Sequence, residues 1–201
     1  MIALPHRAVL ATGNPGKARE FAALLADLGI EVLPQSAFGV PEAAETGLSF
    51  VENAILKARN AARHTGLAAL ADDSGIEVDA LNGAPGIYSA RYAGVGAGDA
   101  ANLEKLLEVL RTVPAEQRSA RFRCVLVWMR HAEDATPVIA QGTWEGSITT
   151  AARGSGGFGY DPVFEVAGLG LTAAELDAAT KNRLSHRARA MACLRALLAG
   201  G

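Results

Sequence analysis

The stretch VLATGNPGKAREF, residues 9–21, decides how the chain begins to fold. The apolar residues before Thr12 are typical of a buried strand, and residues 15–28 place apolar side chains on one face of a helix. A second short strand follows at residues 30–33. A strand, a helix and a strand in this order predict an α/β fold. With the elements that follow, we expect a mixed, twisted central sheet flanked by helices.

The loop TGNPGK, residues 12–17, joins the first strand to the first helix and is similar to a phosphate-binding loop. Its glycines are closer together than in the usual phosphate-binding loop, and Ala18 stands where a Ser or Thr would hold a metal. Gly13 and Gly16 allow a ligand close to the backbone, and Lys17 adds charge at a helix N-terminus. An ordinary turn with a solvated lysine is the alternative. A lysine in a first helical turn opposes the helix dipole, which favours a bound anion.

The helix predicted at residues 49–64 carries two stripes. Ser49 and Glu52 form a capping box at its start. Asn53, Lys57, Asn60 and His64 lie on a polar stripe, separate from the apolar one. Lys57 is either a solvent-facing lysine or a phosphate contact. Further elements predicted downstream are a helix at 99–111, antiparallel strands at 119–131 and 136–148, and three short helical stretches, the last at about 185–199.

Two adjacent acids follow the buried strand predicted at residues 67–71, in the sequence Asp72-Asp73-Ser74-Gly75, and residues 76–78 can continue that strand after a kink. Adjacent strand residues face opposite sides, so both acids share one site only if the chain bends, which Gly75 permits. The sequence leaves open a plain turn closed by an aspartate, a magnesium ligand and a general base. Glu45 is a second loop carboxylate that can join a metal site.

The stretch GSGGFGYDP, residues 154–162, concentrates four glycines in six positions. Such a concentration costs conformational entropy and is typical of a backbone that approaches something closely. Phe158 can stack on a nucleobase, and Asp161 can accept a hydrogen bond from a ring N–H. A flexible hairpin turn is the alternative.

Basic residues gather at the start of the last predicted helix, in KNRLSHR, residues 181–187. Ser185 is suited to cap that helix, which leaves His186 and Arg187 in its first turn. Cations there are unfavourable by about 0.3–1 kcal/mol each. A local rule broken in this way indicates a functional site, here for phosphate or for the carbonyl edge of a base. A solvated basic helix start is the alternative.

The composition excludes several classes of protein. The chain has 201 residues and a formal net charge of −2, which argues against binding to long nucleic acid. No apolar run reaches the roughly 18 residues of a membrane span, and the N-terminus lacks the pattern of a signal peptide. We expect one domain over residues 1–201. Cys124 and Cys193 are both expected to be buried free thiols, as in a reducing cytoplasm.

Five blocks together resemble the inosine/xanthosine triphosphate pyrophosphatase family, in their order and spacing and over nearly the whole chain. The blocks are TGNPGK at 12–17, ETGLSFVENAILKAR at 45–59, ADDSGIEVDALNGAPGIYSARYAG at 71–94, GSGGFGYDPVF at 154–164 and KNRLSHRARA at 181–190. The resemblance implies a Mg²⁺-dependent cytoplasmic homodimer with two lobes and a nucleotide cleft between them. It implies that non-standard purine nucleoside triphosphates such as dITP, ITP and XTP are cleaved to the monophosphate and pyrophosphate.

The resemblance also implies a role for individual residues. Glu45 and Asp73 would bind Mg²⁺, and Asp73 would also accept the proton of the attacking water. Lys57 would contact the phosphates. The other expected substrate contacts are Thr12, Gly13, Asn14, Pro15, Gly16, Lys17, Ser74, Phe158, Gly159, Tyr160, Asp161, Lys181, His186 and Arg187. The chain departs from the family pattern at Ala44, Leu171 and Thr180, none of which has an assigned role.

Selectivity is expected to follow from hydrogen-bond donors, because hypoxanthine and xanthine carry a carbonyl at C6 where adenine carries an amino group. His186 and Arg187 would donate to that carbonyl. Two rival functions remain: a nucleotide-binding sensor without turnover, and a pyrophosphatase of other nucleotides similar to the Maf-like proteins. The intact carboxylates Glu45 and Asp73 argue against the sensor.

Overall fold

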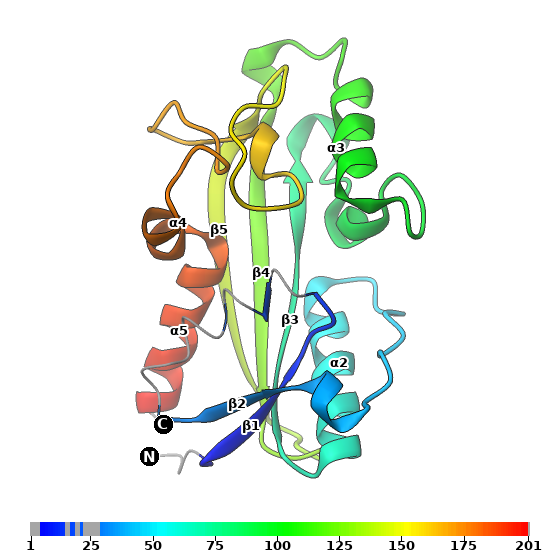
Figure 1. Cartoon of the computed structure of the whole chain (residues 1–201), viewed down its shortest axis with the longest axis vertical. Coiled ribbons are helices and arrows are strands. Elements are labelled where there is room, and N and C mark those ends of the chain that lie inside the picture. Colours follow the sequence, from blue (N-terminus) through cyan, green and yellow to red (C-terminus); the bar gives the residue numbers. More distant parts are fainter. Residues whose placement is uncertain (1–4, 15–16, 19–20, 22–28, 201) are drawn as a thin grey trace. The chain divides into compact units, whose positions relative to one another are not determined.

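The computed structural model describes residues 5–14, 17–18, 21 and 29–200, and there the chain is a mixed α/β structure (Figure 1). The strands described form a six-stranded sheet in the order β2-β1-β3-β4-β5-β6. The strands are β1 Arg7–Ala11, β2 Glu31–Pro34, β3 Ala68–Val78, β4 Ser119–Met129, β5 Val138–Ile148 and β6 Phe164–Val166. The α-helices are α2 Phe50–Thr65, α3 Gly98–Val109, α4 Ala178–Leu184 and α5 His186–Gly200. Short 3₁₀ helices are η2 Gln35–Phe38, η3 Asp79–Leu81, η4 Gly86–Arg91, η5 Ala115–Gln117 and η6 Asp161–Val163.

The pairing of the strands confirms the mixed sheet. β1 pairs in parallel with both β2 and β3, and β5 pairs antiparallel with β6. Parallel neighbours such as β1 and β2 need a crossover connection, which a helix usually supplies. Of the helix predicted over residues 15–28, Lys17, Ala18 and Phe21 are helical, and the rest lies outside the described residues.

The chain divides into two compact units. Unit 1 consists of Met1–Asp73, Cys124–Gly142 and Arg187–Gly201, and unit 2 of Ser74–Arg123 and Thr143–His186. The boundary falls within two of the motifs found in the sequence, between Asp73 and Ser74 and between His186 and Arg187. The single domain and the cleft between two lobes stay predictions.

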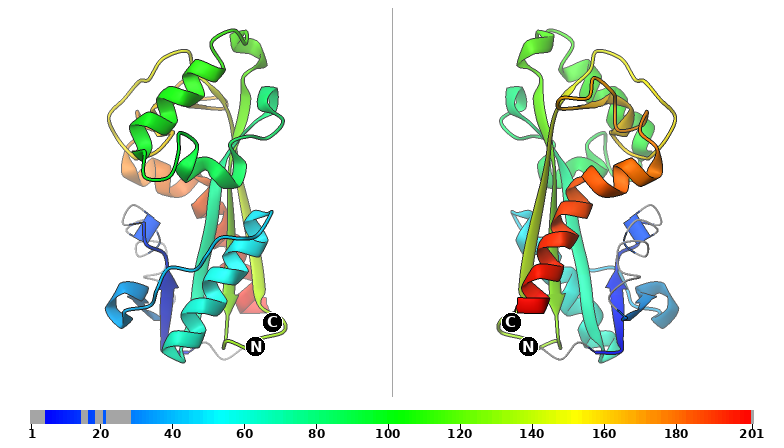
Figure 2. Two further views of the ribbon diagram at one scale, coloured as in Figure 1. Left: turned by 90° about the vertical axis from the view of Figure 1, so that its right-hand side faces the viewer. Right: turned by 90° about the vertical axis from the view of Figure 1, so that its left-hand side faces the viewer.

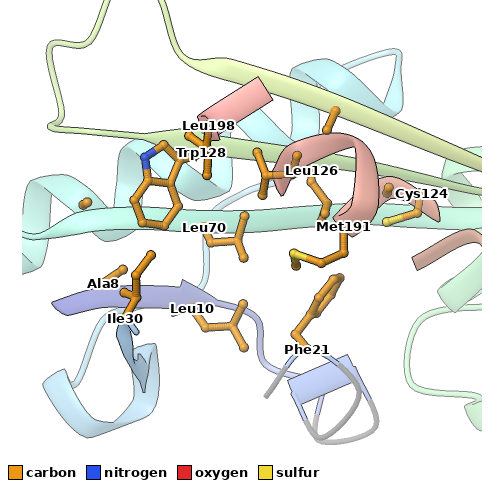
Figure 3. Packing of buried hydrophobic residues seen from close by; sticks show 14 residues of the cluster. Ala8, Leu10, Phe21, Ile30, Leu70, Cys124, Leu126, Trp128, Met191 and Leu198 are labelled. Atoms are coloured by element: carbon orange, nitrogen blue, oxygen red, sulfur yellow. The ribbon is translucent and has the colours of Figure 1, made fainter. Parts of the chain in front are cut away.

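Unit 1 has three layers, because alternate residues of its strands face different helices. On β3, Ala68 and Leu70 pack in a cluster with Met191 and Leu198 of α5. Figure 3 shows Leu70, Met191 and Leu198 of this cluster. Ala69 and Ala71 instead join a cluster with the alanines of α2. The strands of unit 1 therefore lie between α2 and α5, which Figure 2 shows from both sides. Even-numbered residues of this part of β3 face α5, and odd-numbered residues face α2.

Helix α2 begins where the sequence predicts. The Ser49 side chain accepts a hydrogen bond from the Glu52 backbone N–H at 3.4 Å, and the Glu52 carboxylate accepts from the Leu48 backbone N–H at 3.0 Å. This is the capping-box exchange, with Glu52 reaching one residue further back. Gly66, in the left-handed conformation at φ 67°, ends the helix. Apart from Asn53, its buried residues are small alanines, which allow the helix close to the sheet.

The core of unit 2 is rich in aromatic side chains. Phe122, Trp144 and Phe164 lie within 4.6–6.4 Å of one another, measured between ring centroids. Strand β6, which contributes Phe164, was not predicted, because three residues are too few to show a period. The last predicted helical stretch, at about 185–199, is confirmed as α5, and α4 and the short helix η6 precede it.

Strand β4 ends two residues before its predicted limit and β5 begins two residues after its own, and Asp134 organises the connection between them. The Asp134 carboxylate is buried and accepts hydrogen bonds from the backbone N–H groups of Arg130 and Thr136, both at 3.0 Å. It also forms an ion pair with the Arg130 guanidinium. Two backbone donors of the connection are thus bonded to Asp134, and β4 ends at residue 129 while β5 begins at residue 138.

Replacing Asp134 by asparagine is expected to lower the free energy of unfolding by about 1–3 kcal/mol at pH 7, because the amide loses charge-assisted bonds. The hydrogen bonds from Arg130 hold the pKa of Asp134 well below its usual range. A carboxylate whose pKa is lower in the folded than in the unfolded state stabilises the fold. This stabilisation is complete above the ordinary aspartate pKa of about 3.9, and it is lost as the pH falls through the folded pKa. The difference between wild type and D134N, measured by urea denaturation, should therefore shrink below about pH 4. An equal difference at pH 3 and pH 7 would contradict this role.

The prediction that both cysteines are buried is wrong for one of them. Cys124 is buried in the core of unit 1, but Cys193 is exposed, because it lies on the outer side of α5. Both are free thiols. None of the described helices is long and apolar enough to cross a membrane.

Candidate functional site

The loop after β1 is shaped by its own side chains. The Thr12 hydroxyl accepts a hydrogen bond from the Asn14 backbone N–H at 3.2 Å, and the Asn14 side-chain carbonyl accepts one from the Lys17 backbone N–H at 3.1 Å. Asn14 thus caps the helical turn that begins here. The Glu42 carboxylate occupies the space that a side chain on Gly13 would need. Pro15 and Gly16, two of the predicted substrate contacts, lie outside the described residues.

The sequence Asp72-Asp73-Ser74-Gly75 is not a turn. Strand β3 continues through it to Val78, and Gly75 is not among the described residues with positive φ. The expected end of the strand at Asp72 is therefore wrong, whereas its continuation over residues 76–78 is confirmed. The strand tolerates two buried acids because each is paired with a lysine: Asp72 with Lys17, and Asp73 with Lys57. The acids face opposite sides of the sheet, as extended backbone requires.

Lys57 brings the two predicted metal ligands together. Its ammonium lies 2.8 Å from Asp73 Oδ1 and 3.1 Å from Glu45 Oε1. Its side chain is only 15% exposed, so it is not a solvent-facing lysine. Two carboxylates from a strand and a loop thus converge on one positive charge. We call Glu45, Lys57 and Asp73 the carboxylate–lysine cluster; it lies wholly within unit 1.

The polar stripe on α2 holds the loop that carries Glu45. The side-chain carbonyl of Asn53 accepts a hydrogen bond from the Gly47 backbone N–H at 2.9 Å, and the amide of Asn60 donates to the Pro41 carbonyl at 2.7 Å. Lys57 lies between them along the helix and contacts Glu45. Asn53 is also fully buried and donates to Asp73 Oδ2 at 3.5 Å. The second stripe of the predicted helix is therefore the docking face for the loop.

The surroundings set different proton affinities for the two acids. Burial raises the pKa of Asp73 above its ordinary value, against the opposing effect of the Lys57 ammonium. Burial would raise the pKa of Asp72 as well, but the charges of Lys17, Lys57 and Arg187 outweigh it and lower that pKa to about 2. Asp73 is thus the better proton acceptor of the two, and Asp72 is a permanent anion at neutral pH.

Burial also disfavours the charged form of Lys57, but the surrounding carboxylates outweigh this effect and raise its pKa. The lysine is therefore a cation at neutral pH. Its position shows where a positive charge is stabilised between Glu45 and Asp73.

In unit 2, the glycine-rich loop packs against its own chain. A Cβ on Gly154 would lie 2.6 Å from the carbonyl carbon of Ala174, and Gly154 has a φ of 79°. A side chain on Gly157 would collide with the Asp161 carboxylate. The glycines therefore allow the loop to close on itself, which accounts for their number at least in part without a ligand.

Asp161 anchors this loop. Its Oδ2 accepts hydrogen bonds from the Phe158 backbone N–H at 2.8 Å and from the Lys181 ammonium at 2.7 Å. The same ammonium lies 5.0 Å from the centroid of the Phe158 ring. Asp161 is 3% exposed, so its carboxylate fixes Phe158 and Lys181 next to each other. A direct contact of Asp161 with a base stays a prediction.

The neighbouring residues of the loop have structural partners as well. The Tyr160 hydroxyl donates to the Ser89 carbonyl at 2.7 Å, and the ring is buried. The Gly159 backbone N–H donates to Asp99 at 2.9 Å. Ser74 directly follows Asp73 on β3 and is half-buried. Substrate contacts by these three predicted residues stay predictions.

His186 and Arg187 begin α5 but belong to different units. The His186 ring stacks on Phe122 with a centroid distance of 4.8 Å and an angle of 10°. Arg187 contributes to the charge that lowers the pKa of Asp72. Both are buried, at 1% and 5% exposure, so the alternative of a solvated basic helix start is wrong. Ser185 precedes them in extended conformation, as a capping residue does.

Two features of the site were missed in the sequence. The pairing of Lys17 with Asp72 joins the helical turn after β1 to strand β3 and carries no local signal. The sequence showed Asn53 only as part of a polar stripe. Its position one turn before Lys57 was the available signal, because residues so spaced on a helix can contact the same loop.

The carboxylate oxygens of Glu45 and Asp73 fit a small, hard divalent cation. Both already contact a single ammonium, so one cation can reach both. Mg²⁺ in nucleotide enzymes is usually held by one or two carboxylates, with the substrate phosphates and water completing the octahedron. Among the described residues there is no group of three or more acids, histidines or cysteines that could hold a metal without such help.

Comparison with known proteins identifies relatives along nearly the whole chain. The chain is 67% identical to a dITP/XTP pyrophosphatase of Thioalkalivibrio sulfidiphilus, over 96% of this chain and 98% of that protein. It is 59% identical to a dITP/XTP pyrophosphatase of Salmonella typhimurium, over 98% and 100% of the two chains.

Solved structures agree with this relationship. A HAM1 protein from Coxiella burnetii matches with a TM-score of 0.90 and 49% identity, over 98% of this chain and all of that one. The Ham1 protein of Staphylococcus aureus matches with a TM-score of 0.85 and 42% identity, over 96% and 98%. The sequence pattern of the Ham1 family matches residues 8–197. A match of this extent, together with these relatives, shows that the chain belongs to the Ham1 family.

Proposed function

We propose that this protein hydrolyses non-standard purine nucleoside triphosphates such as dITP, ITP and XTP, releasing the monophosphate and pyrophosphate. The observation that carries the proposal is the convergence of Glu45 and Asp73 on the Lys57 ammonium, in a cluster whose side chains are partly or fully buried. The names of the relatives, dITP/XTP pyrophosphatase, support the reaction and the substrate class. The activity removes deaminated purines from the nucleotide pool.

The proposed reaction is attack of a water oxygen on the α-phosphorus. The bond from that phosphorus to the bridging oxygen breaks, and pyrophosphate leaves with the electron pair. The water proton passes to a carboxylate oxygen of Asp73, whose raised pKa suits this role. Lys57 and Lys17 offset the negative charge of the triphosphate and of the departing pyrophosphate. Mg²⁺, held by Glu45 and Asp73, would supply further charge neutralisation.

Base recognition is assigned to residues of unit 2 and the start of α5. Lys181 and the Phe158 ring lie together, and an aromatic face with a cationic donor beside it suits a purine that carries carbonyl oxygens. We assign to His186 and Arg187 the donation to the C6 carbonyl. Adenine would present an amino donor to these donors, and unpaired buried polar groups can give discrimination of about 10⁴-fold.

A release assay tests the reaction. Purified protein with Mg²⁺ is offered dITP, XTP, dGTP, dATP and dTTP, and pyrophosphate and orthophosphate are measured separately. Pyrophosphate from dITP and XTP, with little from the other three, is the expected result. Orthophosphate as the product would refute attack on the α-phosphorus. Turnover of dTTP in preference to dITP would favour the Maf-like alternative, and tight dITP binding without turnover would favour the sensor.

The remaining proposals concern the state of the protein in the cell. We expect a homodimer, which sedimentation equilibrium would test, and a location in the cytoplasm, where nucleotide pools are used. Omission of Mg²⁺ from the assay, with EDTA present, should abolish pyrophosphate release.

A further inference from the structure

One buried charge in unit 1 has no part in the reaction proposed above. Asp72 is 1% exposed, and its Oδ2 lies 2.8 Å from the Lys17 ammonium. We propose that Asp72 is a positioning residue, which holds the ammonium of Lys17 in place for the triphosphate and does not bind the metal. The inference rests on the proposed function.

The geometry of β3 separates Asp72 from the predicted metal. Odd-numbered residues of the strand face α2, where Asp73 meets Lys57 and Glu45. Asp72 is an even-numbered residue of β3, like Ala68 and Leu70, which pack with α5, so its side chain lies on the same face as theirs. Carboxylates on adjacent residues of an extended strand leave it in opposite directions. A small cation bound by Glu45 and Asp73 on the α2 side therefore lies on the opposite face of the strand from the Asp72 carboxylate, and β3 is continuous there.

The contacts of Asp72 point instead to Lys17. A lysine side chain has many rotamers, and fixing it on a phosphate costs conformational entropy. The ion pair with Asp72 fixes Lys17 before a ligand arrives, leaving its side chain 15% exposed. An ammonium has three N–H donors, so a bond to Asp72 leaves donors for phosphate oxygens. Asp72 also faces the charge of Arg187, so it balances two of the cations assigned to the nucleotide.

The Asp72→Asn substitution distinguishes positioning from metal binding. At saturating Mg²⁺, we expect D72N to lower kcat/KM for dITP by roughly 10–100-fold, as the loss of an organised charge–phosphate contact does. The Mg²⁺ concentration for half-maximal activity should stay within about twofold of wild type. The substitution E45Q, at a predicted ligand, should raise that concentration by about tenfold or more. A comparable rise in D72N would overturn the proposal and make Asp72 a metal ligand.

A double-mutant cycle with Lys17 tests whether Asp72 acts through it. If it does, D72N should reduce kcat/KM much less in a K17M background than in wild type. Fully additive effects would overturn the proposal. D134N is the matched control, because it also neutralises a buried, ion-paired aspartate of unit 1, and it should lower stability with little change in kcat/KM.

Binding of tripolyphosphate in EDTA gives a readout that needs neither turnover nor metal. Wild type should be stabilised against heat by tripolyphosphate, and both D72N and K17M should lose most of this shift. An unchanged shift in D72N would refute the positioning role. If wild type binds tripolyphosphate but does not cleave dITP, the proposed function fails while this inference is still tested. Should D72N not fold, D72E, which displaces the charge without removing it, supplies the same comparison.

Discussion

The Asp73→Asn substitution is expected to lower kcat for dITP by roughly 10²–10⁴-fold, the range for loss of a positioned general base. An amide cannot take the proton of the attacking water, and it is a weaker ligand for a hard cation than a carboxylate. Asp73 lies 2.8 Å from Lys57 and receives a further bond from Asn53, so asparagine would also disturb the pairing on which the cluster is built. Initial rates of pyrophosphate release at saturating Mg²⁺ and dITP measure the loss.

D134N is again the control for D73N, because the chemical change is the same and the aspartate lies in the connection between β4 and β5. The kcat of D134N should remain close to that of wild type, measured at a temperature where circular dichroism shows both variants to be folded. A kcat within threefold of wild type for D73N would remove Asp73 from the proposed chemistry. A loss that high Mg²⁺ fully restores would leave Asp73 as a ligand only.

The Lys57→Met substitution is expected to lower kcat by roughly 10²–10³-fold, because Lys57 supplies charge that offsets the developing negative charge on the leaving pyrophosphate. It should also change the response of the free protein to metal. Without the ammonium, Glu45 and Asp73 face each other as like charges, which destabilises the fold until a cation binds. We therefore expect MgCl₂ alone to raise the melting temperature of K57M more than that of wild type, where the metal meets a cation already in place.

Differential scanning fluorimetry over a MgCl₂ titration measures this second effect. The control is K105M, the same chemical change at a lysine of α3 that contacts the Tyr92 carbonyl and lies outside the cluster. K105M should respond to MgCl₂ as wild type does. Equal shifts in K57M and wild type would mean that the ammonium and the metal do not share Glu45 and Asp73.

The local sequence predicted most elements because their signals lie within a few residues. The capping box of Ser49 and Glu52 fixed the start of α2, and apolar residues fixed β1 and the core of β4. The prediction failed where a distant partner changes the local preference. Two adjacent acids at residues 72–73 resemble a turn, yet the strand continues because lysines from the loop after β1 and from α2 neutralise them.

The sequence by itself determined the α/β class, the order of the longer elements and the set of charged residues available for phosphate and metal. It could not determine which cation faces which carboxylate. Because side chains alternate along β3, Asp72 and Asp73 lie on opposite faces. Only the packing of α2 and of the loop docked on it places Lys57 and Glu45 next to Asp73. Asp72 receives Lys17 instead. Ion pairs between distant residues depend on distances of a few ångströms, which no short-range pattern encodes and which tertiary packing alone sets.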